Sequence, residues 1–315
     1  MERNNTAKRA IALACILVLC LTVFCPAPSY AASVTIGTLE LSNTRDLSGK
    51  GYFWDASKHT LTLNNAKLSG RITLPDDGDV TIILKGENTL TLPASINNYP
   101  LFAYTSHDRD ITIRGDGTGS LFIRGFVYLG MFNTLNIEDC ILKIQSDVPT
   151  YYLEQNYSFY AHAFQVNITD SRLICSDGMY LGEDYLVDNS YLEIHHENLR
   201  RATCLNVFRD FNMINNSELH INMVNQDDYC AFRAEGSFYA DASTVVDITT
   251  DGGNAISVRN DICLLSQRLH LSAPGGVIWR APNSPMPESV ILPADYEYEE
   301  DVFKITEIDY AAPSY

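Results

Sequence analysis

The chain has 315 residues, of which 46% are hydrophobic and 19% are charged, and its formal net charge is −17. An acidic chain is repelled by nucleic acids and by anionic membrane surfaces, so the composition argues against both as partners. The length is sufficient for one long β domain with a sizeable core.

Residues 1–31 read as a secretory signal peptide. Three basic residues precede the apolar run Ala10–Phe24, which is too short to span a bilayer comfortably, and Ser29-Tyr30-Ala31 fits cleavage before Ala32. No later apolar stretch reaches transmembrane length, and no carboxy-terminal sorting motif is evident. We therefore expect a secreted or extracellular protein, either released or associated with a cell surface through another molecule.

Residues 32–60 are predicted to form an N-terminal cap. Val34–Gly37 and Leu39–Leu41 alternate as short strands do, and Trp54 lies in an aromatic cluster that could plug the first layer of a repeat fold. A repeat fold needs such a cap, because its first layer would otherwise expose an open strand edge and half a core.

The segment 61–280 reads as strands and turns. Apolar and polar residues alternate in short runs, which include 61–63, 80–82, 111–113, 135–137, 192–194 and 269–271. Side chains at every second position of a strand face the same side, so each run predicts a strand with one buried face. No stretch shows comparable helical periodicity, and the predicted fold class is therefore all-β.

A short phrase recurs within this segment: an apolar alternation, then Asn or Asp, then a small residue. The Asn or Asp positions are Asn65, Asp139, Asp170, Asn189, Asn216 and Asp241, and the series of small residues is Cys140, Ser171, Ser190, Ser217, Ala242 and Ser266. Consecutive small residues are 19 to 31 positions apart. A period of this size carried by short strands predicts a solenoid, here a single parallel β-helix over 61–280, right-handed by the rule for parallel crossovers.

The Asn or Asp of each phrase is expected to hold a turn. Asn and Asp tolerate left-handed backbone conformations, and their side chains bond nearby backbone groups or stack as a ladder. The alternative is a calcium site that includes Asp139 and Asp170, which would require several converging oxygen ligands.

Five cysteines follow the leader: Cys140, Cys175, Cys204, Cys230 and Cys263. An odd number cannot all pair, and none forms a C-x-x-C motif. We expect them to be buried and to act as small hydrophobic residues.

Residues 281–315 break the repeat and are predicted to form a C-terminal cap and tail. Four prolines interrupt 281–293, and an acidic run spans 295–301. Val302–Ile305 is expected to add one more strand, with a loose end after it.

A second series consists of arginines that each follow an apolar residue: Arg209, Arg233, Arg259 and Arg280. If the repeats are in register, these guanidinium groups line one edge at a spacing of about 4.8 Å. One interpretation is a structural salt-bridge ladder, because Asp210, Glu235 and Asp261 lie within two residues of three of them. The other is a binding site for an acidic polysaccharide, since arginine binds carboxylates through a two-pronged fork.

Two further groups of residues are candidates for ligand binding. Tyr152 and Tyr157 lie in an insertion that could form an exposed aromatic loop or pack against the flank of the fold. Asp227, Asp228 and Glu235 lie close to Arg233 in the sequence and could hold Ca²⁺ beside an arginine base, as β-helix lyases do.

Evidence for catalysis is otherwise thin. Adjacent acidic pairs occur at 76–77, 183–184 and 227–228, but neighbours on a strand point to opposite faces, so adjacency argues little for cooperation. His195-His196-Glu197 is a further polar cluster, more typical of a solvated turn.

Several segments resemble the secreted bacterial β-helix proteins of the pectin-lyase-like class, most closely the carbohydrate-binding-domain family of surface proteins from Gram-positive bacteria. The matching segments are Gly51–Asp55, Leu61–Ala66, Val80–Asn88, Ile113–Gly117 and Leu121–Ile123. The resemblance implies non-catalytic glycan binding at a cell surface, with calcium as a candidate cofactor.

The leading hypothesis is therefore a secreted, non-catalytic carbohydrate-binding or adhesin-like protein whose partner is a polysaccharide or cell-surface glycan. One alternative is a polysaccharide lyase or glycoside hydrolase of the pectin-lyase-like class. The second alternative is a structural surface protein without a specific ligand.

Overall fold

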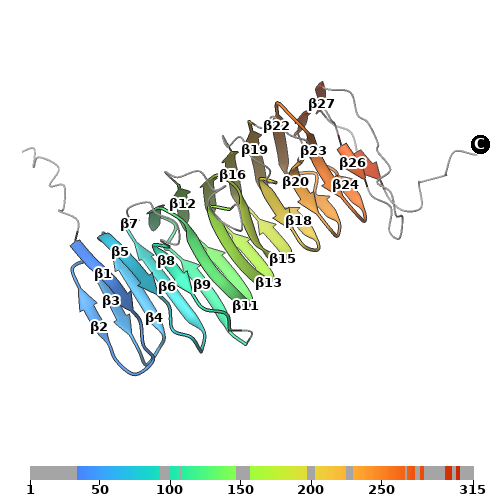
Figure 1. The fold of residues 1–315 in the computed structure, drawn as a ribbon. Coiled ribbons are helices and arrows are strands. Elements are labelled where there is room, and N and C mark those ends of the chain that lie inside the picture. The colour runs from blue at the N-terminus through green and yellow to red at the C-terminus, as the bar shows by residue number, and fades with distance from the viewer. Residues whose placement is uncertain are drawn as a thin grey trace, which may run out of the picture. The chain divides into compact units, whose positions relative to one another are not determined.

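The structure is a computed structural model that describes residues 34–92, 99–106, 108–146, 157–196, 203–224, 230–266, 268–273, 277–279, 295–299 and 303–305 (Figure 1). Within these ranges the chain consists of strands and turns without a helix, which confirms the predicted all-β class. No helix in the described part of the chain could cross a membrane. The predicted signal peptide lies outside the described residues.

The strands form three ladders that are parallel over most of their length. Ladder A contains β4 (Thr60–Asn64), β6 (Val80–Lys85), β9 (Asp110–Arg114), the second halves of β11 (Val127–Glu138), β13 (Phe159–Thr169) and β15 (Met179–Asp188), β18 (Phe211–Ile214), β21 (Phe238–Ala240) and β24 (Ile262–Leu264).

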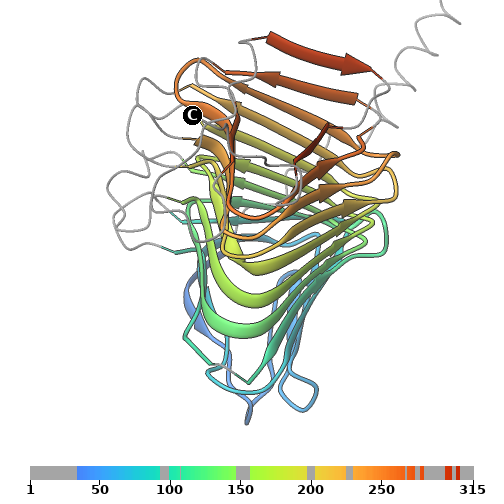
Figure 2. The ribbon, with the colours of Figure 1, turned by 90° about the vertical axis from the view of Figure 1, so that its right-hand side faces the viewer.

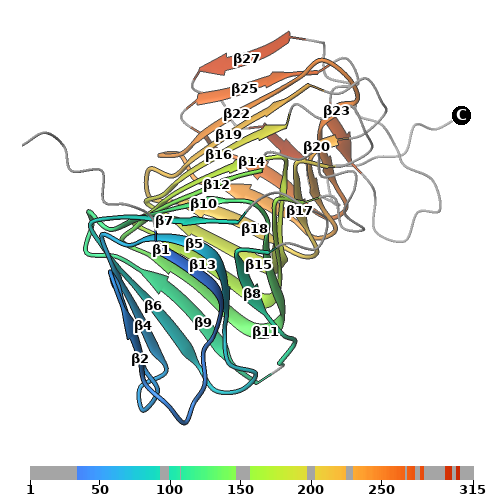
Figure 3. The same ribbon diagram turned by 60° about the vertical axis from the view of Figure 1, so that its left-hand side comes forward.

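Ladder B contains β1 (Val34–Glu40), β5 (Lys67–Thr73), β7 (Glu87–Thr91), β10 (Ser120–Arg124), β12 (Ile141–Gln145), β14 (Arg172–Ser176), β16 (Tyr191–His196), β19 (Glu218–Met223), β22 (Val245–Thr250) and β25 (Arg268–Ser272). Figure 3 shows most of these strands side by side.

Ladder C contains the end of β5, β8 (Leu101–Ala103), the first halves of β11, β13 and β15, then β17 (Leu205–Val207), β20 (Cys230–Ala234), β23 (Asn254–Val258) and β26 (Val277–Trp279). From β8 onward the chain visits the ladders in the order C, A, B and then repeats. The long strands β11, β13 and β15 curve together from ladder C into ladder A (Figure 2).

The core consists of the inward residues of all three ladders, and the alternation seen in the sequence sets its pattern. In ladder A, Ile82, Ile113, Ile137 and Ile168 occupy one register position on successive strands, and each is at most 1% exposed. Further along, Phe211 and Phe238 of ladder A pack against Phe232 of ladder C, with ring centroids 4.5 to 5.3 Å apart. Side chains from different ladders thus fill one continuous interior.

The turn between ladder A and ladder B is built by the predicted phrase. Asn65, Asp139, Asp170, Asn189 and Asn216 all have positive φ, between 44° and 61°, as the turn hypothesis requires. Asp241 does not. Its turn is longer, and its carboxylate instead accepts hydrogen bonds from the N–H (2.8 Å) and Oγ (2.7 Å) of Ser243.

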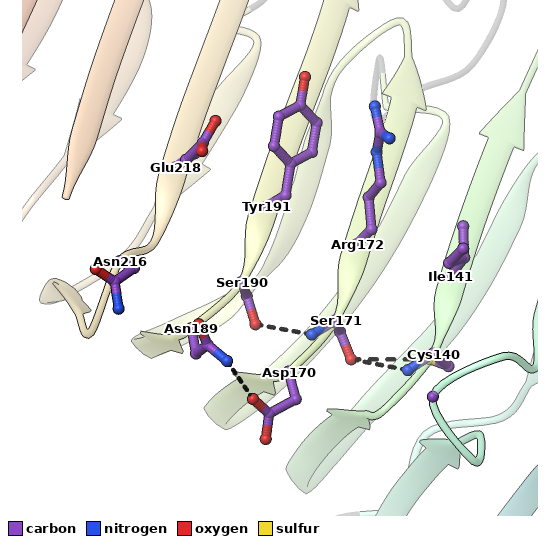
Figure 4. A pocket seen from close by; sticks show the side chains of 11 residues that line it. Cys140, Ile141, Asp170, Ser171, Arg172, Asn189, Ser190, Tyr191, Asn216 and Glu218 are labelled. Carbon is purple, nitrogen blue, oxygen red and sulfur yellow. Dashed lines mark hydrogen bonds between the residues drawn. The ribbon is translucent and has the colours of Figure 1, made fainter. Parts of the chain in front are cut away.

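The small residues after these turns form a buried ladder of hydrogen bonds (Figure 4). The N–H of Cys140 donates to Ser171 Oγ (3.2 Å), that of Ser171 to Ser190 Oγ (3.1 Å), and that of Ser190 to Ser217 Oγ (3.3 Å). The next position is Thr244, since Glu218 pairs with Val245, so the assignment of Ala242 to this column was wrong by two residues.

Replacing Ser190 with alanine is expected to lower the free energy of unfolding by about 1–3 kcal/mol, because the buried N–H of Ser171 would lose its acceptor. Urea denaturation measures the change. Ser48→Ala, at an exposed serine, is the control and should leave stability unchanged. Equal stabilities of the two variants would contradict a role for the serine ladder.

Both ends of the ladders carry antiparallel strands. At the first end, β2 (Leu47–Gly49), β3 (Tyr52–Asp55) and β4 pair antiparallel, and the predicted plug Trp54 is fully buried with its Nε1 donating to the Ser42 carbonyl (2.8 Å). At the other end, β27 (Asp295–Glu299) pairs with β25 and β28 (Phe303–Ile305) with β24. The strand expected near Val302–Ile305 is therefore present.

The five cysteines between residues 140 and 263 form no disulfide. Cys140, Cys175, Cys204 and Cys230 are buried, and Cys263 is half-buried. Burial raises the pKa of Cys140 to about 11 and also raises the pKa values of Cys175 and Cys204 well above the ordinary value. These thiols are therefore packing residues with little thiolate at neutral pH.

Candidate functional site

The outer face of ladder C carries a column of aromatic side chains. Phe102, Tyr128, Tyr160 and Tyr180 occupy one register position on β8, β11, β13 and β15. Their ring centroids are 5.5, 5.3 and 5.3 Å apart in turn, with interplanar angles of 17°, 13° and 23°. We call these four residues the aromatic column.

Both ends of the aromatic column are covered. The guanidinium carbon of Arg71 lies 5.7 Å from the centroid of the Phe102 ring, and the ring of Tyr157 lies 5.8 Å from that of Tyr180. Because each ring face is stacked against a neighbour, the column presents ring edges and Tyr hydroxyls outward. Stacked rings of this kind stabilise the ladder and leave few faces for a ligand.

Of the two tyrosines proposed for ligand binding, Tyr157 packs at the end of the aromatic column, as the packing alternative required. Burial raises the pKa of its phenol to about 12, against a lowering contribution from its hydrogen bond with Asn206. Tyr152 lies outside the described residues.

Next to the aromatic column, the strands bend at Gly182 and bring charged residues together. The register slips between Tyr180 and Gly182, whose φ is 148°, and a Cβ at Gly182 would lie 2.0 Å from the carbonyl oxygen of Ala163. Only glycine fits this close approach.

Arg209 contacts both acidic residues that follow the bend. Its Nε lies 3.1 Å from Glu183 Oε2, and its Nη1 lies 3.7 Å from Asp184 Oδ2. The sequence argument that adjacent carboxylates point to opposite faces is therefore wrong here, because the bend turns both toward one guanidinium. His162 Nε2 lies 3.6 Å from Glu183 Oε1, and these four residues form what we call the Glu183 centre.

The carboxylate of Glu183 is buried and incompletely bonded. The residue is 8% exposed, and its Oε2 has no hydrogen-bond partner among the residues that the structure describes, because the nearby Arg209 is in ion-pair contact without hydrogen-bond geometry. A buried acceptor without a donor costs about 1–3 kcal/mol, which the ion pair with Arg209 offsets in part.

Two exposed phenyl rings flank Glu183, that of Phe164 on β13 and that of Phe208 directly after β17. Ala163 pairs with Gly182 and Gln165 with Asp184, which places Phe164 opposite Glu183 on one side. On the other side the N–H of Arg209 donates to the Glu183 carbonyl, which places Phe208 opposite it. Phe164 is 41% exposed and Phe208 is 55% exposed, so both rings are accessible to a ligand.

The predicted arginine series does not form one column. Arg233 continues the register of the aromatic column through Asn206, whereas Arg209 and Arg259 lie beyond the ends of β17 and β23. The arginine spacings of 24 and 26 residues do not follow the register, which advances by 27 residues from Leu205 to Phe232 and by 24 from Phe232 to Ile256. Arg280 lies outside the described residues.

Each described arginine of the series is paired with an acidic residue. Arg233 Nε donates to Glu235 Oε1 (2.8 Å), and Arg259 Nη1 lies 3.5 Å from Glu235 Oε2. Glu235 is therefore a partner, as expected. Asp210, also expected, instead accepts a hydrogen bond from the N–H of Ser237 (2.6 Å), and Arg209 pairs with Glu183 and Asp184. The series therefore carries little uncompensated positive charge.

The proposed calcium ligands are not seen together. Asp227 and Asp228 lie outside the described residues, and Glu235 is occupied by two arginines. In the described ranges no three His, Cys, Asp or Glu residues are grouped as metal ligands would be. Asp170, which was named with Asp139 as a further calcium candidate, accepts a hydrogen bond from Asn189 Nδ2 (2.5 Å) within the turn.

Sequence reasoning missed the aromatic column and the Glu183 centre. A signal for the column was present, because its members lie in the triplets Leu101-Phe102-Ala103, Val127-Tyr128-Leu129, Phe159-Tyr160-Ala161 and Met179-Tyr180-Leu181. For the Glu183 centre the sequence showed the acidic pair 183–184 and Arg209 but not their contact, since that contact depends on a register slip.

No family model, curated protein or solved structure matches this chain. The resemblance to carbohydrate-binding β-helix proteins therefore rests on the quoted segments alone, and function has to be argued from the site.

Proposed function

We propose that this protein is a secreted, non-catalytic carbohydrate-binding protein, and that the glycan lies along the outer face of ladder C. The observation that carries the proposal is the Glu183 centre, where the carboxylates of Glu183 and Asp184 lie between the exposed rings of Phe164 and Phe208. Sugar rings stack on exposed aromatic faces, and their hydroxyls donate to accessible carboxylates such as Asp184, whose side chain is 42% exposed.

The same proposal includes a right-handed parallel β-helix. The recurring order C, A, B and the in-register pairing of successive strands support it, since a chain that winds around one core would produce this order. The handedness rests on the general preference of parallel crossovers.

The chemistry of the site favours an uncharged glycan over an acidic one. The guanidinium groups of Arg209, Arg233 and Arg259 already face carboxylates, and the whole chain is strongly acidic. A polyuronate would have to displace these ion pairs and approach against the net charge. An uncharged polysaccharide meets neither cost.

Lyase or hydrolase activity is the alternative to a purely binding role. Glu183 and Asp184 share one guanidinium, which places two carboxylates near the proposed ligand. Incubation with polygalacturonate and with uncharged polysaccharides, followed by ultraviolet absorption and reducing-end assays, distinguishes the two. Released product would replace the binding proposal with an enzymatic one.

Exchange of Glu183 for glutamine and of Phe208 for alanine should each weaken glycan binding at least about tenfold, or about 1.4 kcal/mol. A glycan array identifies the ligand, and calorimetry with that ligand measures the affinities. Phe53→Ala is the matched control, because Phe53 is a phenyl ring with 44% exposure in the antiparallel strands of the first end.

Two results would count against the proposal. The first is an array on which the wild-type protein binds no glycan. The second is a ligand whose affinity is the same for the wild type and for both site variants.

A further inference from the structure

The outer face of ladder B carries three adjoining grooves that the proposed function does not use. Their volumes are about 320, 520 and 310 Å³. The first and third share Tyr191, and the second and third share Glu193 and His195. Together they cross the strands from β12 to β22.

One row on this face alternates carboxylates and imidazoles. Glu193, His220, Asp247 and His270 occupy a single register position on β16, β19, β22 and β25. Asp247 lies between two histidines, with His270 Nδ1 at 2.8 Å and His220 Nδ1 at 3.6 Å. His220 Nε2 in addition lies 2.9 Å from Glu218 Oε2.

Glu193 fixes the side chains at the centre of the face. Its carboxylate accepts hydrogen bonds from Tyr191 Oη (2.8 Å), from Arg172 Nη2 (3.3 Å) and, when that nitrogen is protonated, from His195 Nε2 (2.8 Å). Burial raises the pKa of Glu193, but these three hydrogen bonds outweigh burial and hold it below its ordinary value.

The ring of Tyr191 is packed between two side chains, in addition to the hydrogen bond that its hydroxyl makes. The guanidinium carbon of Arg172 lies 4.3 Å from the ring centroid, and the imidazole of His220 stacks against the ring at 5.1 Å. Figure 4 shows Arg172, Tyr191 and Glu218 on successive strands, projecting on the same side. An array that is already ordered loses little conformational entropy when a ligand binds.

The chemistry of the face selects among ligand classes. The carboxylates of Glu193, Glu218 and Asp247 outnumber the two cations on this face, Arg172 and Lys143, which disfavours a polyanion. The array also offers few apolar side chains to a hydrophobic peptide. Donors and acceptors alternate instead at the strand spacing, and the five strands span about 19 Å. Such an array matches the closely spaced hydroxyls of a sugar chain.

We propose that the outer face of ladder B, between β12 and β22, is a second binding site that takes a linear, uncharged oligosaccharide lying across the strands. The side chains in direct contact are Arg172, Glu193, His195 and His220, with the exposed groups of Arg172 and His195 at about half of their full accessibility. This site is separate from the face of ladder C and stands or fails independently of it.

The histidines allow one spectrum to test both faces. In protein labelled with ¹⁵N and ¹³C in histidine only, His195 and His220 report on ladder B, His162 reports on the Glu183 centre, and buried His196 reports on any global change. The probes are cellohexaose, chitohexaose, xylohexaose and mannohexaose at up to about 10 mM, which detects a Kd of about 1 mM. Single His→Asn variants assign the resonances.

Saturable shifts of His195 and His220 with at least one probe, without a shift of His196, are expected. Arg172→Ala and the milder Glu193→Gln should then weaken that binding at least about tenfold, with an unchanged unfolding midpoint as the check on folding. Shifts confined to His162 would overturn this inference and support the proposed function. Shifts confined to His195 and His220 would support this inference and would show that none of these probes binds at the Glu183 centre. The second site is also overturned if His195 and His220 respond to no probe, or only together with His196.

Discussion

Replacing Phe211 with alanine is expected to lower the free energy of unfolding by about 3–5 kcal/mol, because the side chain is fully buried and truncation would leave a cavity. Its ring lies 5.5 Å from that of Tyr185, 5.2 Å from Phe232 and 5.3 Å from Phe238. Phe232 belongs to ladder C and the other rings to ladder A, so the cavity would form where the two ladders meet. No backbone pairing joins the described strands of the two ladders across this contact, so side-chain packing holds them together there.

Urea denaturation followed by circular dichroism measures this loss. Phe208→Ala is the matched control, because Phe208 is 55% exposed and its removal should change stability by less than about 0.5 kcal/mol. If Phe211→Ala were no more destabilised than Phe208→Ala, the aromatic cluster would not be the junction between the ladders that the structure indicates.

The second large effect concerns His196, a neutral imidazole inside the core. The residue is 1% exposed, and neither ring nitrogen has a hydrogen-bond partner among the described residues. Burial lowers its pKa to about 4, whereas its ordinary value is 6.5. Between pH 6.5 and 4 the imidazole of His196 is protonated in the unfolded chain but stays neutral in the folded chain. The free energy of unfolding therefore falls as the pH drops from 6.5 toward 4.

This difference corresponds to about 3 kcal/mol lost between neutral pH and pH 4. Replacing His196 with leucine should remove that part of the acid loss. It should also raise stability at pH 7 by about 1 kcal/mol or more, because an unbonded polar group leaves the core. Urea midpoints at pH 7, 5.5 and 4.5 measure both effects.

His195→Leu is the control for this experiment, because His195 precedes His196 on β16 but faces outward beside Glu193. It should keep the pH dependence that depends on His196. Parallel pH profiles for the wild type and His196→Leu would show that the buried imidazole is not the titrating group.

Much of the strand pattern followed from the sequence, because alternation and turn residues are local properties. The turns at Asn65, Asp139, Asp170, Asn189 and Asn216 were found from residue type alone, since left-handed backbone restricts the choice to few residues. The prediction was wrong for Asp241, because its turn has two extra residues before the next strand. Its carboxylate accepts hydrogen bonds from Ser243 within that turn.

The outer faces were harder to predict, since they depend on register between distant segments. The arginine series had nearly equal spacing, yet Arg233 lies within a strand and Arg209 beyond one. The neighbouring residues His195 and His196 face opposite sides of β16. The imidazole of His195 lies in the array on ladder B, and that of His196 lies in the core. Neither outcome can be read from spacing, because each depends on the position at which a strand begins and ends.

The pairing scheme has a consequence for cooperativity. Each inner strand hydrogen-bonds to the strands before and after it in its own ladder. The first and last parallel strands of ladder A, β4 and β24, are therefore connected only through all the strands between them. In such an array stability is a sum of nearest-neighbour contributions, and fraying can advance from one end while the other end remains intact. The antiparallel strands at the two ends therefore oppose local unfolding from either end. Local unfolding near β24 would leave the remaining strands of the ladders ordered.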